Sequence, residues 1–257
     1  MIYCRWAPTL GTLEDTAENI WGTPEYEGDK EEPTVFFGLY GFPDFYSLWR
    51  HRGKKYILWA GSDIRHFSQG YWLERDGVVK LDPKPLALWI QRNCESYVEN
   101  TVEYDELAKW GIIAKIVPSF LGNVDNFTPQ IIDSKKRYYS SVSGNDFDLY
   151  AWGKLNKIAE ENPDIEYHFY GNTVLWKAPQ NVIIHGRVPK EQMNKEVKNM
   201  TGAIRMVEFE GCSELIVKSV LWGQKPISLI DYDFLHSDNP REELLKVLNN
   251  FPWNLKK

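Results

Sequence analysis

Short apolar runs alternate with amphipathic segments along the first half of the chain. The pattern predicts strands at 2–6, 34–40, 55–60, 96–98 and 112–117, and helices at 44–51, 85–93 and 101–110. Asp44 would cap the first of these helices, and 13–21 is the one helical candidate in the polar stretch before residue 34. Strands that alternate with helices predict a parallel sheet covered by helices.

A second alternating series follows a polar stretch at 121–136. It predicts strands at 137–142, 165–170, 182–184, 202–207 and 226–230, and helices at 147–161, 191–199, 213–221 and 241–250. We place the domain boundary after residue 127. The expected fold class is therefore α/β, with two Rossmann-like domains, 1–127 and 128–257, that face each other across a cleft.

Composition narrows the class of protein. The 257 residues are 43% hydrophobic and 26% charged, which predicts a globular protein with a packed core. No uninterrupted apolar run of about 18 residues occurs, and the start lacks the pattern of a signal peptide, so we expect a cytoplasmic protein. A net charge of -6 disfavours a nucleic-acid partner, because such binding depends on neutralising phosphates. Cys4, Cys94 and Cys212 lack disulfide or metal-knuckle spacing and favour a reducing compartment.

Small residues follow the predicted strands, where ligands bind in open parallel sheets. These segments are Gly61-Ser62-Asp63, Ser143-Gly144-Asn145, Gly171-Asn172, Gly186-Arg187-Val188 and 208–213. Glycine lets backbone amides approach a phosphate, and Gly211-Cys212-Ser213 opens a helix whose N-terminal amides favour an anion. The pattern predicts a ligand with a diphosphate. Neither G-x-G-x-x-G nor G-x-x-x-x-G-K-[ST] occurs in the chain.

Residues 181–228 resemble the C-terminal half of the retaining nucleotide-sugar glycosyltransferases of family four, which have the two-domain GT-B fold. The resemblance rests on the pair Glu210-Gly211, on Gly223 and Pro226 after the following helix, and on Asn181 with Gly186. It implies transfer of a sugar from a UDP or GDP donor to a hydroxyl acceptor on a glycan, lipid or protein. It also implies retention at the anomeric carbon. We expect no metal and no cofactor, because helix dipoles can serve in place of a metal. The first domain would be the acceptor side and the second the donor side.

The expected site residues combine this resemblance with the strand ends. Glu210 would orient the sugar hydroxyls, and Asp63 would act beside it. The expected donor-binding residues are Gly211, Cys212, Ser213, Lys218, Arg205, Gly171, Asn172, Ser143, Arg187 and Val188. Simpler roles remain open: Glu210 could stabilise a helix start, Asp63 could cap the next element, and Arg205 could pair with an acid.

Two departures from the family pattern favour an alternative. Lys218 stands eight positions after Glu210, where the family commonly has a carboxylate that binds the donor ribose, and a lysine cannot accept those hydrogen bonds. The turn after the first strand of the second domain also lacks the Arg and Lys that many members use for the diphosphate. The alternative is a GT-B-like binding or scaffold protein without donor chemistry.

Three groups of side chains outside these turns suggest further contacts. The basic residues in 51–55 could touch anionic lipid at a membrane. Trp72 and Trp176 could stack on a sugar. His66, His168 and His185 lack metal-ligand spacing and are expected to be ordinary strand-end or core histidines.

Overall fold

The computed structural model describes residues 1–13, 21–24, 26–28, 31–74, 78–142, 148–171 and 177–253, with the backbone alone at 11–13, 72–74, 78 and 79. Most of the expected helix at 13–21 falls outside the described residues, as do the predicted site residues Ser143 and Asn172 and the stacking candidate Trp176. The Trp72 side chain is not described either.

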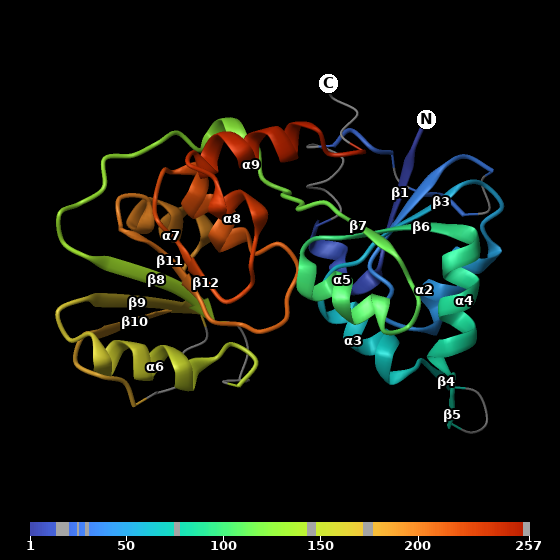
Figure 1. Ribbon diagram of the computed structural model, residues 1–257, viewed down its shortest axis with the longest axis horizontal. Coiled ribbons are helices and arrows are strands. Elements are labelled where there is room, and N and C mark those ends of the chain that lie inside the picture. The colour runs from blue at the N-terminus through green and yellow to red at the C-terminus, as the bar shows by residue number, and fades with distance from the viewer. Residues whose placement is uncertain are drawn as a thin grey trace. The chain divides into compact units, whose positions relative to one another are not determined.

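The chain forms two compact α/β units, each built on a parallel five-stranded sheet (Figure 1). Unit 1 comprises Met1–Asn123, Phe209–Cys212 and Leu245–Lys257, and unit 2 comprises Val124–Glu208 and Ser213–Leu244. A single division after residue 127 would therefore leave two later segments of unit 1, one of which carries Glu210, in the wrong part of the chain.

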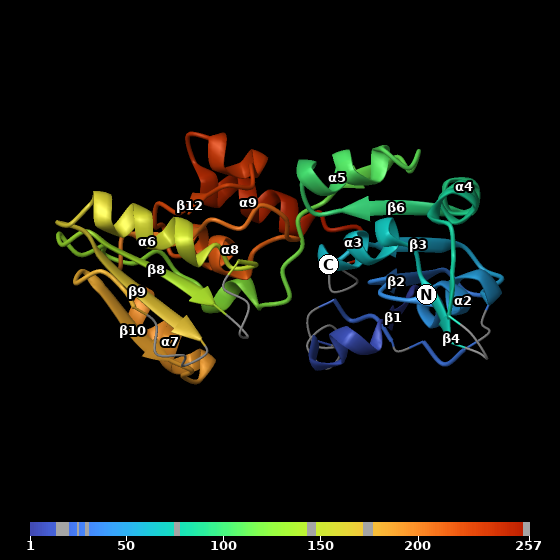
Figure 2. The same cartoon turned by 90° about the horizontal axis from the view of Figure 1, so that it is seen from below.

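Unit 1 contains a parallel sheet in the order β1-β2-β3-β6-β7, and Figure 2 shows β1, β2, β3 and β6 following one another in that order. The strands are β1 (Tyr3–Trp6), β2 (Thr34–Phe37), β3 (Lys55–Leu58), β6 (Cys94–Val98) and β7 (Ala114–Ile116). The helices are η1 (Pro8–Leu13), α2 (Phe42–Arg50), α3 (Ser62–Gln69), α4 (Pro83–Asn93) and α5 (Thr101–Ala108). A small antiparallel hairpin, β4 (Trp72–Glu74) with β5 (Val78–Lys80), lies between α3 and α4 in the sequence.

Period-two alternation along the strands builds one core on each face of this sheet. Phe36 and Ile57 pack with the buried sides of α2, α3, α4 and α5 on one face. Val35 and Leu58 pack on the other face, where Trp253 also lies. The C-terminal segment thus supplies part of the cover that unit 1 needs.

Unit 2 contains a second parallel sheet, in the order β10-β9-β8-β11-β12. Its strands are β8 (Arg137–Val142), β9 (Glu166–Gly171), β10 (Val182–Gly186), β11 (Gly202–Arg205) and β12 (Ile227–Ser228). Its helices are η2 (Val124–Asn126), α6 (Trp152–Glu161), α7 (Lys190–Val197), α8 (Glu214–Leu221) and η3 (Asp233–His236); α9 (Pro240–Asn249) begins in unit 2 and ends in unit 1.

The predicted alternation of strands and helices is confirmed, and the differences are local. The strand expected at 34–40 ends at Phe37, because Gly38 takes a left-handed φ of 79°. Asp44 is not the cap of α2 but lies in its first turn, where its carboxylate accepts the backbone N–H groups of Tyr40 and Gly41 at 2.9 and 3.2 Å. Helix α3 and the β4–β5 hairpin were not predicted. No helix in the described part of the chain is long and apolar enough to cross a membrane.

Candidate functional site

Asp63 joins two strand ends at the carboxyl edge of the unit 1 sheet. Its Oδ2 accepts the N–H of Leu39 at 2.9 Å, after β2, and its Oδ1 accepts the N–H of Ala60 at 3.0 Å, after β3. The side chain is fully buried, and burial raises the pKa of Asp63 to about 7. The N-cap of α3 is Gly61, so Asp63 holds two loops together and does not cap the helix.

Glu99 and Asn100 follow the next strand, β6, and Glu103 lies in the first turn of α5. Two hydrogen bonds join this loop to the helix start. The Asn100 Oδ1 accepts the N–H of Glu103 at 3.0 Å, and the Glu103 Oε2 accepts the N–H of Glu99 at 2.6 Å. Both glutamates are buried. Burial raises the pKa of Glu99 to about 7, and burial together with the charge of Glu99 raises the pKa of Glu103 well above its ordinary value. Two buried carboxyl groups that interact favour a state in which at least one of them holds a proton.

The segment Phe209–Cys212 packs against these residues within unit 1. The Asn100 Nδ2 donates to the carbonyl of Glu210 at 2.7 Å, and the N–H of Cys212 donates to the Glu99 Oε2 at 2.7 Å. The other oxygen of Glu99 accepts the hydroxyl of Ser119, which follows β7. The backbone on either side of Gly211 is therefore fixed by one amide and one carboxylate from the loop after β6.

Gly211 and Gly61 make this close packing possible. A Cβ atom on Gly211 would overlap the Glu99 carboxylate, and a Cβ atom on Gly61 would lie 2.6 Å from the backbone nitrogen of Gly211. Gly61 also has a left-handed φ of 79°. Any larger residue at either position would push the segment away from the sheet edge.

Four of the expected site residues thus belong to unit 1: Asp63, Glu210, Gly211 and Cys212. The arrangement changes the chemistry expected of the backbone amides, because the N–H of Cys212 already donates to Glu99. The N–H of Ser213 likewise donates to the Tyr232 hydroxyl at 3.1 Å. These two amides were expected to face a diphosphate, and in this structure both are occupied by protein side chains.

Arg205 and Gly171 lie at the carboxyl edge of the unit 2 sheet. The Arg205 Nη1 donates to the carbonyl of Ser141 at 2.8 Å, and the guanidinium carbon lies 5.2 Å from the centre of the Tyr150 ring. Gly171 has φ of 128°, and a Cβ atom there would overlap the backbone of Val142. Arg205 therefore contacts a backbone carbonyl and an aromatic ring within unit 2.

Two further predicted residues follow β10. Gly186 turns the chain with φ of 72°, Arg187 is exposed, and Val188 is half-buried. Arg187 and Arg205 are the expected donor-binding cations that lie at this sheet edge, because each directly follows or ends a strand of the same parallel sheet.

Lys218 lies in a different environment. Its side chain is buried on α8, where its Nζ lies 2.9 Å from the Glu214 Oε1, one turn earlier. Glu214 also binds the Lys190 Nζ at 2.8 Å. Burial lowers the pKa of Lys218, and the charge of Glu214 opposes that shift. The charge of Lys218 is therefore largely neutralised within unit 2.

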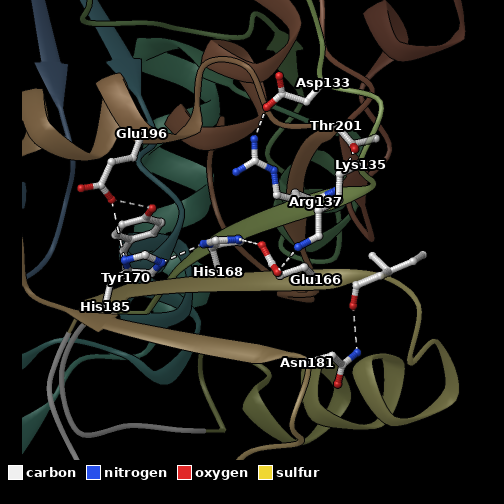
Figure 3. A network of polar contacts seen from close by, with 11 residues as sticks. Asp133, Lys135, Arg137, Glu166, His168, Tyr170, Asn181, His185, Glu196 and Thr201 are labelled. Atoms are coloured by element: carbon white, nitrogen blue, oxygen red, sulfur yellow. Dashed lines mark hydrogen bonds and ion pairs between the residues drawn. The ribbon is translucent and has the colours of Figure 1, made fainter.

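A chain of polar contacts crosses β9 and β10 on the α7 side (Figure 3). The His168 Nε2 lies 2.8 Å from the Glu166 Oε1, and the His168 Nδ1 lies 2.8 Å from the His185 Nε2. The His185 ring stacks on Tyr170 at 4.2 Å, and the Tyr170 hydroxyl donates to Glu196 of α7 at 2.9 Å. Burial, with a smaller contribution from His168, lowers the pKa of His185. His168 and His185, which were expected to be ordinary strand-end or core histidines, are neighbours because β9 and β10 pair in a register that places Ile183 opposite His168.

Tyr170 and His185 directly precede Gly171 and Gly186, so the network supports both glycine turns of this edge. Asn181, one of the residues that carry the family resemblance, lies at the opposite end of β10, where its Nδ2 donates to the carbonyls of Ala159 and Ile165, each at 2.9 Å. In the described part of the chain, no group of three or more His, Cys, Asp or Glu side chains is arranged to hold a metal ion.

Sequence reasoning missed Glu99, Asn100 and Glu103. A signal was present, since an acidic residue directly follows the buried strand and Asn100 stands three positions before Glu103, the spacing of a capped helix start. What the spacing could not reveal is the contact to Cys212, which is 113 residues away.

Comparison with known proteins decides the fold. S. aureus TarM in complex with fondaparinux, alpha-GlcNAc-glycerol and UDP is similar over 92% of this chain, with a TM-score of 0.56 and 11% identity. Sucrose-phosphate synthase from Thermosynechococcus elongatus (84% of this chain, TM-score 0.54, 10% identity) and Anabaena HepE with UDP and glucose (95%, 0.51, 10%) are also similar. The chain has the GT-B fold.

The similar proteins share the GT-B fold with this chain at low sequence identity, and each of them is longer than this chain. The chain spans 50% of the length of TarM, 59% of sucrose-phosphate synthase and 71% of HepE. No family model matches the sequence. No curated protein matches it either.

Proposed function

We propose that this chain transfers a sugar from a nucleotide-diphosphate sugar to a hydroxyl acceptor. The observation that carries the proposal is the GT-B fold. The structural similarity to TarM extends over more than nine tenths of this chain. TarM and HepE are described as complexes with UDP. A UDP-sugar is accordingly the first donor class to test.

In the proposed mechanism, unit 2 binds the donor at the carboxyl edge of its sheet. Arg205 and Arg187 supply positive charge to the diphosphate, which leaves with the negative charge of the broken bond. Gly171 and Gly186 let the donor approach the backbone, and the Glu166–His168–His185 network holds these two turns. Metal-independent transfer with retention at the anomeric carbon is part of the proposal.

Glu210 orients the sugar hydroxyls in this mechanism. Its backbone is held by Asn100 on one side and, through Cys212, by Glu99 on the other, so its position is set by residues of unit 1. A carboxylate can accept hydrogen bonds from two adjacent hydroxyls, each worth about 1.5–3 kcal/mol when the group is charged. Unit 1 is the proposed acceptor side.

Calorimetric titration with UDP, GDP and a panel of their sugars, with and without a chelator, tests the proposal. We expect one nucleotide to bind, and Arg205→Gln to weaken that binding at least tenfold. Arg52→Gln, a change of the same type at an exposed position of unit 1, is the matched control and should bind as the native protein does. Absence of binding by every nucleotide and nucleotide sugar at millimolar concentration would refute the proposal.

A non-catalytic GT-B-like binding protein is the second candidate. It is favoured by Lys218, which occupies the position of a family carboxylate and is already paired with Glu214, and by the occupied amides of Cys212 and Ser213. This candidate predicts donor binding without turnover, or no donor binding until Lys218→Glu restores a carboxylate. Measuring product formation and the anomeric configuration of the product by NMR separates it from the enzyme.

A further inference from the structure

His185 lies at a break in the pairing of β10 with β9. Ile184 pairs with Phe169 and Gly186 pairs with Tyr170, so His185 is an extra residue without a partner position on β9. In the described part of the chain, β10 also lies at the edge of its sheet, beside β9. The sheet therefore holds the backbone of His185 weakly, and the position of this residue depends on the contacts of its side chain.

The His185 ring contacts two side chains of β9 (Figure 3). It stacks on the Tyr170 ring with 13° between the two planes, and its Nε2 lies 2.8 Å from the His168 Nδ1. Its Nδ1 faces Glu196 of α7, with 3.7 Å to the Oε2. The side chain of His168 is 8% exposed and that of His185 is 23% exposed. Because Arg187 follows two positions later, these contacts also fix the start of the turn that carries it.

The contact between the two imidazole rings has room for one proton. The Glu166 carboxylate can only accept, so the His168 Nε2, 2.8 Å from the Glu166 Oε1, carries a proton. Between the rings one nitrogen must then donate and the other accept. This condition is met when both rings are neutral and when one ring is charged. When both are charged, all four nitrogens carry protons, two N–H groups face each other, and the contact is lost.

The charges around the pair decide where the second positive charge enters. A hydrogen bond from Lys135 lowers the pKa of Glu166, so its carboxylate stays charged and retains the proton of His168. Burial and the charge of His168 lower the pKa of His185, and the charge of Glu196 opposes this shift. The second charge therefore enters on His185, at a pH below the ordinary histidine value of about 6.5.

The other groups packed against the pair keep their charge over this range. On β8, Arg137 pairs with Asp133, and burial raises the pKa of Tyr139. Burial also raises the pKa of Tyr170, and a hydrogen bond within α7 lowers the pKa of Glu196. Both tyrosines are thus neutral and Glu196 is charged between about pH 5 and pH 8. The protons of the two histidines are what changes.

We propose that His168 and His185 are positioning residues for the donor, which hold Arg187 at the carboxyl edge of the unit 2 sheet while at most one of the two rings is charged and release it in acid. This role rests on the proposed function, in which Arg187 supplies charge to the donor diphosphate. When the second proton enters, His185 is the ring that moves, because His168 is buried and held by Glu166. Arg187 then loses its place, and donor binding weakens.

Calorimetric titration with UDP-glucose, or with GDP-glucose where only GDP binds, tests this role between about pH 5 and pH 8. A nucleotide sugar is the probe because its diphosphate has no terminal phosphate group, whose second proton would bind at about pH 6. We expect the native protein to bind about tenfold more weakly at pH 5 than at pH 7.5, since one charge-assisted contact to the diphosphate is lost.

Substitutions separate the pair from other titrating groups. The amide of His185→Gln can donate to His168 or accept from it, so affinities at the two pH values should agree within about twofold. His236→Gln, the same change at a histidine of unit 2 that is 67% exposed, is the matched control and should keep the native dependence. Glu196→Gln removes a charge that favours protonated His185, so the loss of binding should shift to lower pH. Circular dichroism verifies the fold of each variant.

Nitrogen NMR of the imidazole rings tests the proton count without any donor. The chain has five histidines, so each resonance can be assigned by substitution. We expect His168 and His185 to titrate in two coupled steps, the second below about pH 6.5. In His185→Gln, His168 should titrate in a single step.

Independent titration of the two rings near pH 6.5 would overturn the positioning role. A native pH dependence of binding that persists in His185→Gln would overturn it too. So would tighter binding in acid, because His185 would then attract the diphosphate as a cation. Absence of nucleotide-sugar binding at every pH would instead refute the proposed function, and the positioning role with it.

Discussion

Glu99 accepts the backbone N–H of Cys212 at 2.7 Å, and this contact brings the segment of Glu210 into unit 1. The carboxylate is buried and also accepts the hydroxyl of Ser119, so one side chain links the loop after β6, the loop after β7 and a segment from the second half of the sequence. Buried carboxylates titrate at unusual pH values, and the contact is therefore sensitive to pH.

Glu99→Gln should flatten the pH dependence of stability. Because the folded-state pKa of Glu99 is about 7 and the ordinary value of a glutamate is lower, the folded state binds more protons between about pH 4.5 and 7. Stability from this group is complete below that window and is lost as the pH rises through about 7. Asp63 adds a change of the same sign.

Urea unfolding midpoints at about pH 5 and about pH 8, followed by tryptophan fluorescence, measure this effect. Glutamine can accept the N–H of Cys212 and donate to the Ser119 hydroxyl without carrying a charge. The difference in unfolding free energy between about pH 5 and about pH 8 should therefore shrink by a few kcal/mol. An unchanged difference in Glu99→Gln would assign the pH dependence to other groups.

Asn100→Ala should release the segment Phe209–Cys212. The change removes the donor to the carbonyl of Glu210 and the cap of α5, and loss of a cap costs about 1 kcal/mol. Hydrogen exchange of the Cys212 amide, measured by mass spectrometry, should accelerate at least tenfold. Asn100→Ser keeps a capping oxygen and loses the side-chain amide N–H that reaches the Glu210 carbonyl, so it should show the faster exchange with near-native stability.

Glu210→Gln should lower sugar transfer by roughly 10- to 1,000-fold if the proposed function is correct, because the amide keeps the shape and loses the charge that steadies a cationic sugar. Initial rates with saturating donor measure the loss. Glu208→Gln is the control: Glu208 is exposed and pairs with Lys154, so its loss should change rates less than twofold. Native turnover in a folded Glu210→Gln protein would remove Glu210 from the site.

Lys218→Glu should destabilise unit 2 by about 2 kcal/mol or more, because it places a second carboxylate beside Glu214 in a buried position. Lys218→Met keeps the apolar stem and leaves Glu214 paired with Lys190, so it should cost less. Thermal unfolding of both variants makes the comparison. Equal melting temperatures for the two would show that a second carboxylate beside Glu214 does not lower stability.

The native protein should lose stability as His185 gains a proton at acid pH, and His185→Phe should not show this loss. The folded-state pKa of His185 is lowered, so its contribution is present above the ordinary value of about 6.5 and is lost as the pH falls below it. Phenylalanine keeps the ring on Tyr170 and loses the hydrogen bond to His168, which is worth about 1 kcal/mol. The difference between variant and native unfolding curves should narrow from about pH 7 to pH 5; a constant difference would contradict the assignment.

The sequence by itself determined the two parallel sheets and the residues at their carboxyl edges. The apolar run predicted as a strand at 34–40, the helical spacing at 101–110 and the glycines after strands are local features, and neighbouring residues report the elements although not where each one ends. The β4–β5 hairpin was not predicted, because its strands have three residues each, too few for a periodic pattern of apolar and polar residues.

Only the tertiary structure decided what the side chains at those edges contact. Cys212 meets Glu99 across 113 residues, His168 meets His185 across 17, and Lys218 pairs with Glu214. Such pairs are chosen by the register of strands and by the exclusion of water from the sheet edge. Burial then sets their protonation, and neither register nor burial is encoded in the spacing of residues along a chain.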